Sequence, residues 1–279
     1  VSSITAYCSQ IVVMTQNSAD ILMSTYGISR DKITVIAHGT HLAPAKNKQA
    51  TLAQYNLLGK KVLSTFGLLG PSKSIETTLY ALPVIIEQNP NVLFLILGQT
   101  HPTLLQREGE AYRNLLQEII DQQGLSDHVR FVNEFLSIEV LLAYLSITDV
   151  YLFTSKDPFQ AVSGTFSYAL SSGCPIVSTP IPHVREVLKE DMGTMIDFEA
   201  SDQLAEAVNQ ILDDTPRLDK IRHVNLQKMV KTSWQNVAIA HVNLFELLMD
   251  EKREMTYSIP PLNLDHIFRM STARAFVQF

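Results

Sequence analysis

The chain has 279 residues, of which 46% are hydrophobic, and it carries 22 basic and 28 acidic side chains. This length can bury a substantial core as one large or two small domains, and a charged content of 18% excludes a disordered or fibrous chain. The net charge of −6 disfavours a nucleic-acid-binding surface, the two cysteines form neither a disulfide framework nor a CxxC zinc pair, and the longest apolar run falls far short of the roughly 20 residues of a membrane span.

Short apolar runs alternate with segments of helical period along the chain. In chain order they predict strand 11–15, helix 18–27, strands 32–39 and 60–70, helix 72–90, strand 92–98, helix 108–124, strand 129–135, helix 138–149, strand 150–155, helix 163–173, strand 175–179, helix 183–188, strand 193–197 and helix 201–214. This alternation predicts a parallel sheet with helices on both faces. Together with the composition and the two cysteines, it predicts a reduced, cytoplasmic, globular α/β protein. The run 92–97 is apolar throughout, so we expect it to be buried on both faces.

The two ends of the chain differ from this pattern. Val1 is not methionine, and Phe279 ends an apolar stretch where a natural terminus is more often polar, so we expect a fragment of a longer polypeptide. Pro260 and Pro261 are typical of a linker or docking arm.

One candidate site is the segment 65–76, because ligands of a doubly wound sheet bind beyond the carboxyl ends of its strands. Its glycines let the backbone approach a ligand, the following helix offers free N–H groups, and Lys73 adds a charge suited to phosphate. The sequence is not a Walker loop, and an ordinary turn with a surface lysine is the alternative interpretation.

Two further loops are candidates. Ser163, Gly164 and Thr165 stand where a helix begins, so they either cradle a diphosphate or simply cap the helix. Gly98 ends the buried strand, and His101 in the loop behind it either contacts a sugar or phosphate or has a structural role. No HExxH, GxSxG or metal-ligand cluster is found in the sequence.

Several motifs occur in an order that resembles the C-terminal half of a GT-B glycosyltransferase of the retaining, glycogen-synthase-like group 1 superfamily. The matching pieces include STFGLLGPSKSIETTLYALP, NVLFLILGQTHP and SGTFSYALSSGCPIVSTPIPHVREVL, within residues 11–250. The resemblance implies a Rossmann-like, doubly wound domain that binds a nucleotide-diphosphate sugar, with no metal or cofactor, for transfer to an acceptor hydroxyl. It also implies three segments: 1–17 from a missing N-terminal acceptor domain or crossover, 18–250 as the nucleotide-sugar domain, and 251–279 as a linker toward a possible C-terminal domain.

The resemblance implies a set of donor-binding residues and no catalytic residue within this chain. The expected set is Gly67, Lys73, Gly98, His101, Asn133, Phe135, Asp157, Ser163, Gly164 and Thr165. Three positions depart from the family pattern: Leu68 replaces an arginine, Ser74 replaces the glycine after the lysine, and Tyr168 falls where the second of two carboxylates is usual.

These departures leave two alternatives beside the glycosyltransferase. One is a non-catalytic GT-B module that acts as a scaffold or interaction domain. The other is a sugar-nucleotide epimerase of the same architecture, which needs acid and base residues that the chain does not clearly provide.

Overall fold

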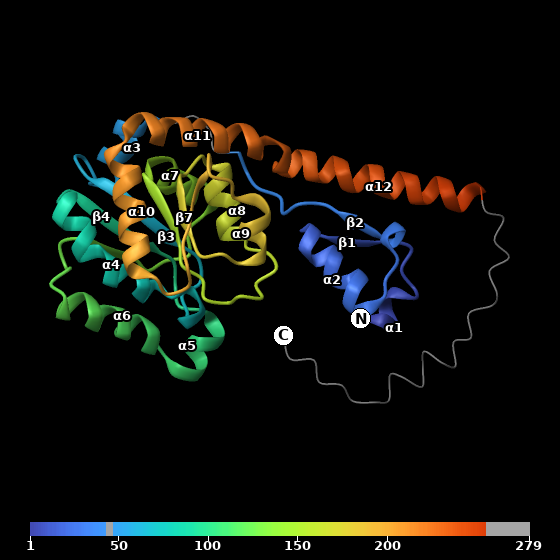
Figure 1. Ribbon diagram of the computed structural model, residues 1–279, viewed down its shortest axis with the longest axis horizontal. Helices are drawn as coiled ribbons and strands as arrows, with labels where there is room; N and C mark the ends of the chain where they lie inside the picture. Colours follow the sequence, from blue (N-terminus) through green and yellow to red (C-terminus); the bar gives the residue numbers. More distant parts are fainter. Residues whose placement is uncertain (43–46, 255–279) are drawn as a thin grey trace. The chain divides into compact units, whose positions relative to one another are not determined.

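The computed structural model describes residues 1–42 and 47–254 (Figure 1). The chain divides into two compact units, Val1–Ile239 and Ala240–Phe279. Most of the predicted linker 251–279 lies outside the described residues, and its first four residues continue a helix.

Six parallel strands form the main sheet of the first unit. They are β3 (Lys61–Phe66), β4 (Val92–Leu97), β5 (Val129–Val132), β6 (Val150–Phe153), β7 (Ile176–Ser178) and β8 (Gly193–Met195). Their order is β5-β4-β3-β6-β7-β8, and every neighbouring pair is parallel. This is the doubly wound order of the Rossmann fold, in which the winding reverses between the first and fourth strands of the sheet, here β3 and β6. The predicted fold class is therefore confirmed.

Helices cover both faces of this sheet (Figure 1). One face packs against α4 (Ile75–Gln88), α6 (Ala111–Gln122) and α10 (Ser201–Asp213), and the other against α3 (Lys48–Gln54), α7 (Ile138–Ile147), α8 (Gly164–Ser171), α9 (Pro182–Val187) and α11 (Thr215–Met229). Alternate residues of β4 enter opposite cores, Phe94 one and Leu95 the other. Residues 92–97 are all buried, which confirms the expectation for this apolar run.

Several elements differ from the expectation, including helix α3, for which no element was predicted. The predicted helix 108–124 corresponds to α6 (Ala111–Gln122), and a separate, unpredicted helix, α5 (Pro102–Glu108), precedes it. Gly109, with a positive φ of 62°, separates the two. The predicted strand 60–70 ends at Phe66, because the chain turns at Gly67 with a φ of 119°. Helix α11 was not expected, and its N-cap Asp214 accepts a hydrogen bond from the N–H of Arg217 at 2.9 Å.

The strands predicted at 11–15 and 32–39 do not join the main sheet. They form β1 (Ile11–Val13) and β2 (Ile33–Val35), which pair only with each other, in parallel, across α2 (Gln16–Tyr26). Val12 is 38% exposed, so these short strands are not covered on both faces as the central strands β4 and β6 are. The expected start of the nucleotide-sugar domain, residue 18, lies between the two paired strands. The short helix α1 (Ser2–Thr5) precedes them.

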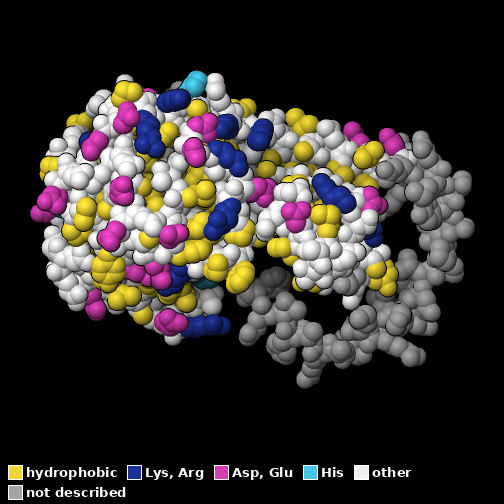
Figure 2. Space-filling model, viewed as in Figure 1, with side chains coloured by type: hydrophobic (Ala, Val, Ile, Leu, Met, Phe, Trp, Pro, Cys, Tyr) yellow, Lys and Arg dark blue, Asp and Glu magenta, His cyan; other side chains and the backbone are white. Residues whose placement is uncertain are grey.

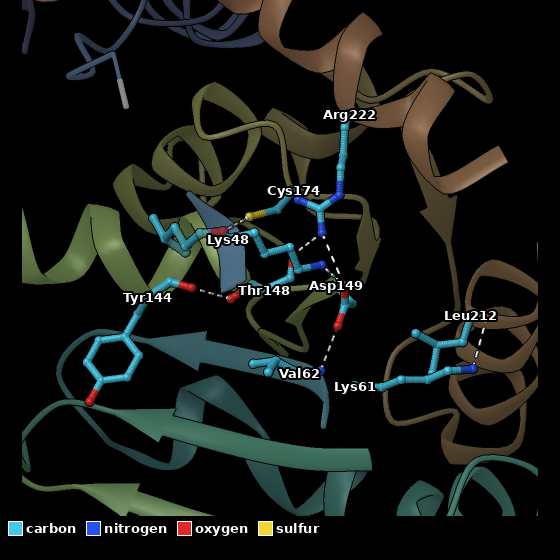
Figure 3. A network of polar contacts seen from close by, with 10 residues as sticks. Lys48, Lys61, Val62, Tyr144, Thr148, Asp149, Cys174, Leu212 and Arg222 are labelled. Carbon is cyan, nitrogen blue, oxygen red and sulfur yellow. Dashed lines mark hydrogen bonds and ion pairs between the residues drawn. The ribbon is translucent and has the colours of Figure 1, made fainter. Parts of the chain in front are cut away.

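A polar network ties four elements together at the amino ends of β3 and β6 (Figure 3). Asp149, which is 8% exposed, accepts the N–H of Val62 at 2.8 Å. Its carboxylate also pairs with Lys48 of α3 at 2.6 Å and with Arg222 of α11 at 3.4 Å. The buried charge is therefore compensated, and the network fixes the end of the sheet opposite to the strand carboxyl ends.

The described part of the second unit is the C-terminal portion of α12 (Trp234–Glu254). Among the described residues, no helix combines the length and the hydropathy that a membrane crossing demands. On the face of the molecule drawn in Figure 2, Lys and Arg side chains are interspersed with Asp and Glu.

Candidate functional site

A cavity opens where the winding of the sheet reverses, beyond the carboxyl ends of β3 and β6. We call it the switch-point cavity. Its volume is about 280 Å³. It is lined by the end of β3, the 3-10 turn η2 (Pro71–Lys73), the loop after β6 and the start of α8. Thr65, Leu68, Ser72, Lys73, Phe153, Thr154, Ser155, Gln160, Val162, Ser163, Gly164 and Thr165 make up this lining.

Lys73 supplies the positive charge of this cavity. Its Nζ donates a hydrogen bond to the carbonyl oxygen of Phe66 at 3.1 Å, and its own carbonyl accepts the hydroxyl of Thr154 at 2.8 Å. Burial lowers the pKa of Lys73 to about 8. Because the ammonium is desolvated and no carboxylate is paired with it in the described structure, an anionic ligand would stabilise its charged form.

Gly67 has no side chain, and this lets Lys73 and the start of α8 approach each other. A Cβ at this position would lie 3.1 Å from Lys73 Nζ and 3.1 Å from the methyl carbon of Thr165. The positive φ of 119° also favours glycine. The glycine therefore lets two predicted binding residues, from segments about ninety positions apart, face the same small space.

The first turn of α8 presents hydrogen-bond donors at the other wall of the cavity. The Ser163 hydroxyl caps the helix by accepting the N–H of Phe166 at 3.3 Å, and it lies 3.1 Å from the hydroxyl of Thr165. The backbone N–H of Ser163 donates to Nδ1 of His183 at 3.1 Å. The helix N-terminus, with its partial positive charge, is thus placed opposite Lys73.

A second, apolar cavity of about 220 Å³ lies beyond β3, β4 and β5. Leu68 lines both cavities, so the two adjoin. The lining of the apolar cavity comprises Phe66, Gly67, Leu68, Leu97, Gly98, Gln99, Glu134, Phe135, Leu136 and Leu141. Predicted residues Gly67, Gly98 and Phe135 therefore meet here, while Lys73, Ser163, Gly164 and Thr165 meet in the switch-point cavity.

Asn133 lies beside the apolar cavity and not in its wall. Its Oδ1 accepts a hydrogen bond at 2.7 Å from Arg113, which also donates to the carbonyl of Gly98 at 3.2 Å. The guanidinium of Arg113 lies 5.1 Å from the centre of the Phe131 ring. Arg113 therefore joins the loops after β4 and β5.

Besides Asn133, two further predicted residues line neither cavity. The exposed side chain of His101 caps α5, where its Nδ1 accepts the N–H of Thr103 at 3.2 Å. The exposed carboxylate of Asp157 accepts the N–H of Phe159 at 2.9 Å, within its own turn. The loop between β6 and α8 instead contributes Gln160, which the sequence analysis did not select.

Tyr168 also faces away from both cavities. Its hydroxyl is hydrogen-bonded to Nδ1 of His41 at 2.6 Å and accepts the indole N–H of Trp234 at 3.3 Å. Within the described residues no cluster of three or more His, Cys, Asp and Glu side chains is arranged to hold a metal ion.

The family model for "Glycosyl transferases group 1" matches residues 47–227, which is more than half of the chain. The chain belongs to this family. The matched region contains all six strands of the main sheet and every residue that lines the two cavities.

Two curated proteins and one solved structure illustrate what this chain is similar to. Spore coat protein SA of Bacillus subtilis is 24% identical over 250 residues, a match of 85% of this chain and 64% of that protein. The D-inositol 3-phosphate glycosyltransferase of Corynebacterium urealyticum is 24% identical over 247 residues, with 85% and 56% covered. The crystal structure of Anabaena HepE in complex with UDP and glucose superposes with a TM-score of 0.72 and 20% identity, over 88% of this chain and 64% of that one.

The chain therefore spans less than two thirds of the length of these relatives. The likeness in fold identifies the six-stranded domain as the C-terminal half of a GT-B glycosyltransferase fold.

Proposed function

We propose that this chain supplies the donor-binding half of a glycosyltransferase, which holds a nucleoside-diphosphate sugar for transfer to an acceptor hydroxyl. The observation that carries the proposal is the convergence of Lys73 and the first turn of α8 on one cavity across Gly67. That cavity lies at the reversal of the sheet, where doubly wound domains bind their ligands.

The diphosphate of the donor occupies the switch-point cavity in this proposal. When the bond to the sugar breaks, negative charge develops on the departing diphosphate. We infer that the ammonium of Lys73, the N-terminus of α8 and the hydroxyls of Ser163 and Thr165 stabilise that charge, because all of them line this cavity. The chain itself supplies the positive potential, so the proposal includes no resident cofactor.

The nucleoside occupies the adjoining apolar cavity. Its walls are mainly apolar, and the glycines Gly67 and Gly98 allow a flat ring to approach the backbone. Leu68 stands between base and diphosphate because it lines both cavities. Uridine is the first nucleoside to test, since HepE was crystallised with UDP.

The remaining parts of the proposal concern partners and location. We propose that the acceptor is bound by a separate domain N-terminal to the main sheet, because the family relatives are longer than this chain. We place the protein in the cytoplasm, which agrees with the free thiols of Cys8 and Cys174.

A non-catalytic module is the second candidate. It is favoured by Leu68, which leaves the boundary between the cavities without a second cation, and by Tyr168, whose hydroxyl is engaged with His41 and Trp234. This candidate predicts that the chain binds no nucleoside diphosphate.

Calorimetric titration of the chain with UDP, GDP and ADP distinguishes the donor-binding domain from the non-catalytic module. We expect one nucleotide to bind, and Lys73→Ala to weaken it roughly tenfold to a hundredfold, as loss of a charge-assisted hydrogen bond does. Lys220→Ala, which removes an exposed lysine that lines neither cavity, is the matched control and should leave the affinity unchanged. Absence of binding by all three nucleotides would overturn the donor-site proposal and favour the non-catalytic module.

A further inference from the structure

His183 is a buried histidine at the second position of α9. Only 6% of the residue is exposed. Its ring packs edge-on against Phe166 of α8, with the ring centres 5.2 Å apart and the planes at 75°. His183 therefore packs between α9 and α8, next to the turn that begins α8.

The ring is oriented by a hydrogen bond to the backbone of that turn. Nδ1 accepts the N–H of Ser163, with a nitrogen–nitrogen distance of 3.1 Å. An accepting Nδ1 carries no proton, so the neutral ring has its proton on Nε2. Burial lowers the pKa of His183 to about 4, the effect of His38 adds to this lowering, and Glu186 opposes it. The acceptor is therefore intact at neutral pH.

Ser163 is the point at which the loop after β6 becomes helix. Its N–H is one of the four donors that a helix leaves unpaired, and in many helices a Glu or Gln three residues later accepts it. Here that later residue is Phe166, which has no acceptor, and the histidine of another helix takes its place. Since Ser163 N–H and Phe166 N–H are both satisfied, the N–H groups of Gly164 and Thr165 between them are left at the cavity wall.

Resting on the proposed function, we propose that His183 is a positioning residue of the donor site, which holds the Ser163–Thr165 turn in the conformation that binds a diphosphate. It touches neither cavity wall of that site, so it acts through Ser163. Without Nδ1 of His183 as acceptor, the backbone of Ser163 can rotate. The backbone N–H groups of Gly164 and Thr165 then no longer point toward the same place in the cavity.

A pair of variants separates positioning from packing. His183→Leu keeps an apolar side chain of similar size against Phe166 but accepts no hydrogen bond. His183→Asn offers Oδ1 close to the place of Nδ1 and restores an acceptor. Each variant of the full 279-residue chain is titrated with UDP and with uridine, or with GDP and guanosine or ADP and adenosine where that pair binds.

We expect His183→Leu to weaken UDP binding roughly fivefold to tenfold, the value of one backbone hydrogen bond, while uridine affinity stays within about twofold. His183→Asn should recover most of the UDP affinity. A purely structural role predicts instead that UDP and uridine affinities fall together, or that only the melting temperature changes. Either result overturns the inference.

Amide exchange provides a readout that needs no ligand. In the native chain the Ser163 amide should be protected, in His183→Leu it should exchange faster, and in His183→Asn it should regain protection. Equal exchange in all three overturns the inference. Failure of the proposed function is distinguishable, because it is seen in the native chain: a native chain that binds no nucleotide ends both proposals, whereas native binding with unchanged His183→Leu ends only this one.

Discussion

Gly98 lies against Gly67 so closely that a Cβ on Gly98 would stand 2.2 Å from the carbonyl oxygen of Gly67. The contact continues the pairing of β3 with β4, in which Gly67 N–H donates to Leu97 at 2.9 Å. Both glycines have positive φ values, 119° and 131°. The close approach of these two loops places both glycines in the wall of the apolar cavity.

Gly98→Ala should therefore be strongly destabilising. We expect a loss of about 3 kcal/mol or more in the free energy of unfolding, because a backbone clash is added to an unfavourable φ. Gly27→Ala is the control, since Gly27 has a positive φ in the left-handed helical region and open space around the added carbon, and it should cost only about 1 kcal/mol. Urea unfolding of both variants measures the difference, and equal losses would contradict the steric explanation.

Nucleotide affinity should depend on the charge of Lys73. The bound diphosphate favours the ammonium form, whose pKa in the free chain is lowered to about 8 by burial. UDP affinity should then fall, by up to about tenfold between roughly pH 7 and pH 9.5, as free Lys73 loses its proton. Lys73→Met should bind more weakly and show a flat profile. A native profile that is equally flat would rule out Lys73 as the titrating group.

The stability of the fold should depend on Lys73 in the opposite direction: it should rise with pH, whereas nucleotide affinity falls. Its pKa is lowered in the folded chain from the ordinary value of 10.5, so between about pH 8 and pH 10.5 the unfolded chain binds more protons. The contribution of Lys73 to stability therefore rises with pH across this window, and the penalty for its burial is fully present below it. Comparing urea midpoints of native chain and Lys73→Met across the window tests this, and a difference that does not narrow as pH rises would refute it.

Leu68→Arg should strengthen diphosphate binding. Leu68 is 40% exposed and lines both cavities, and a guanidinium there could form a bidentate contact with phosphate. We expect UDP affinity to rise roughly tenfold and uridine affinity to change little. Leu68→Gln, which adds length and polarity without charge, is the matched control. A gain of the same size in both variants would show that charge is not the cause.

Asp149→Asn should destabilise the fold without altering the site. The change leaves Lys48 and Arg222 without their common carboxylate in a mostly buried network, so we expect a loss of about 3 kcal/mol in the free energy of unfolding. Asp191→Asn breaks the solvent-exposed pair with Lys228, which water screens, and should lower the stability much less. Thermal or urea unfolding gives both values. If Asp149→Asn has native stability, the network around Asp149 does not stabilise the fold.

Some features of the site followed from the sequence because they depend on neighbouring residues. A strand that runs into Gly67, with Lys73 at the start of a helix, is a local pattern, and so is the Ser163 cap of α8. The structure brings both segments to one cavity. His101 and Asp157 carried equally plausible local patterns, yet their side chains complete their own turns. Local sequence does not distinguish a polar side chain that faces a ligand from one that satisfies nearby backbone.

The sequence by itself determined the alternation of strands and helices and the burial of residues 92–97, because hydrophobic period and helix caps are properties of short segments. Only the tertiary structure decided that β3 and β6 are neighbours, that Arg113 joins the loops at Gly98 and Asn133, and that His183 reaches Ser163. These contacts join residues between 15 and 87 positions apart in the chain. Their formation depends on the order in which strands pack into one sheet, which no local pattern encodes.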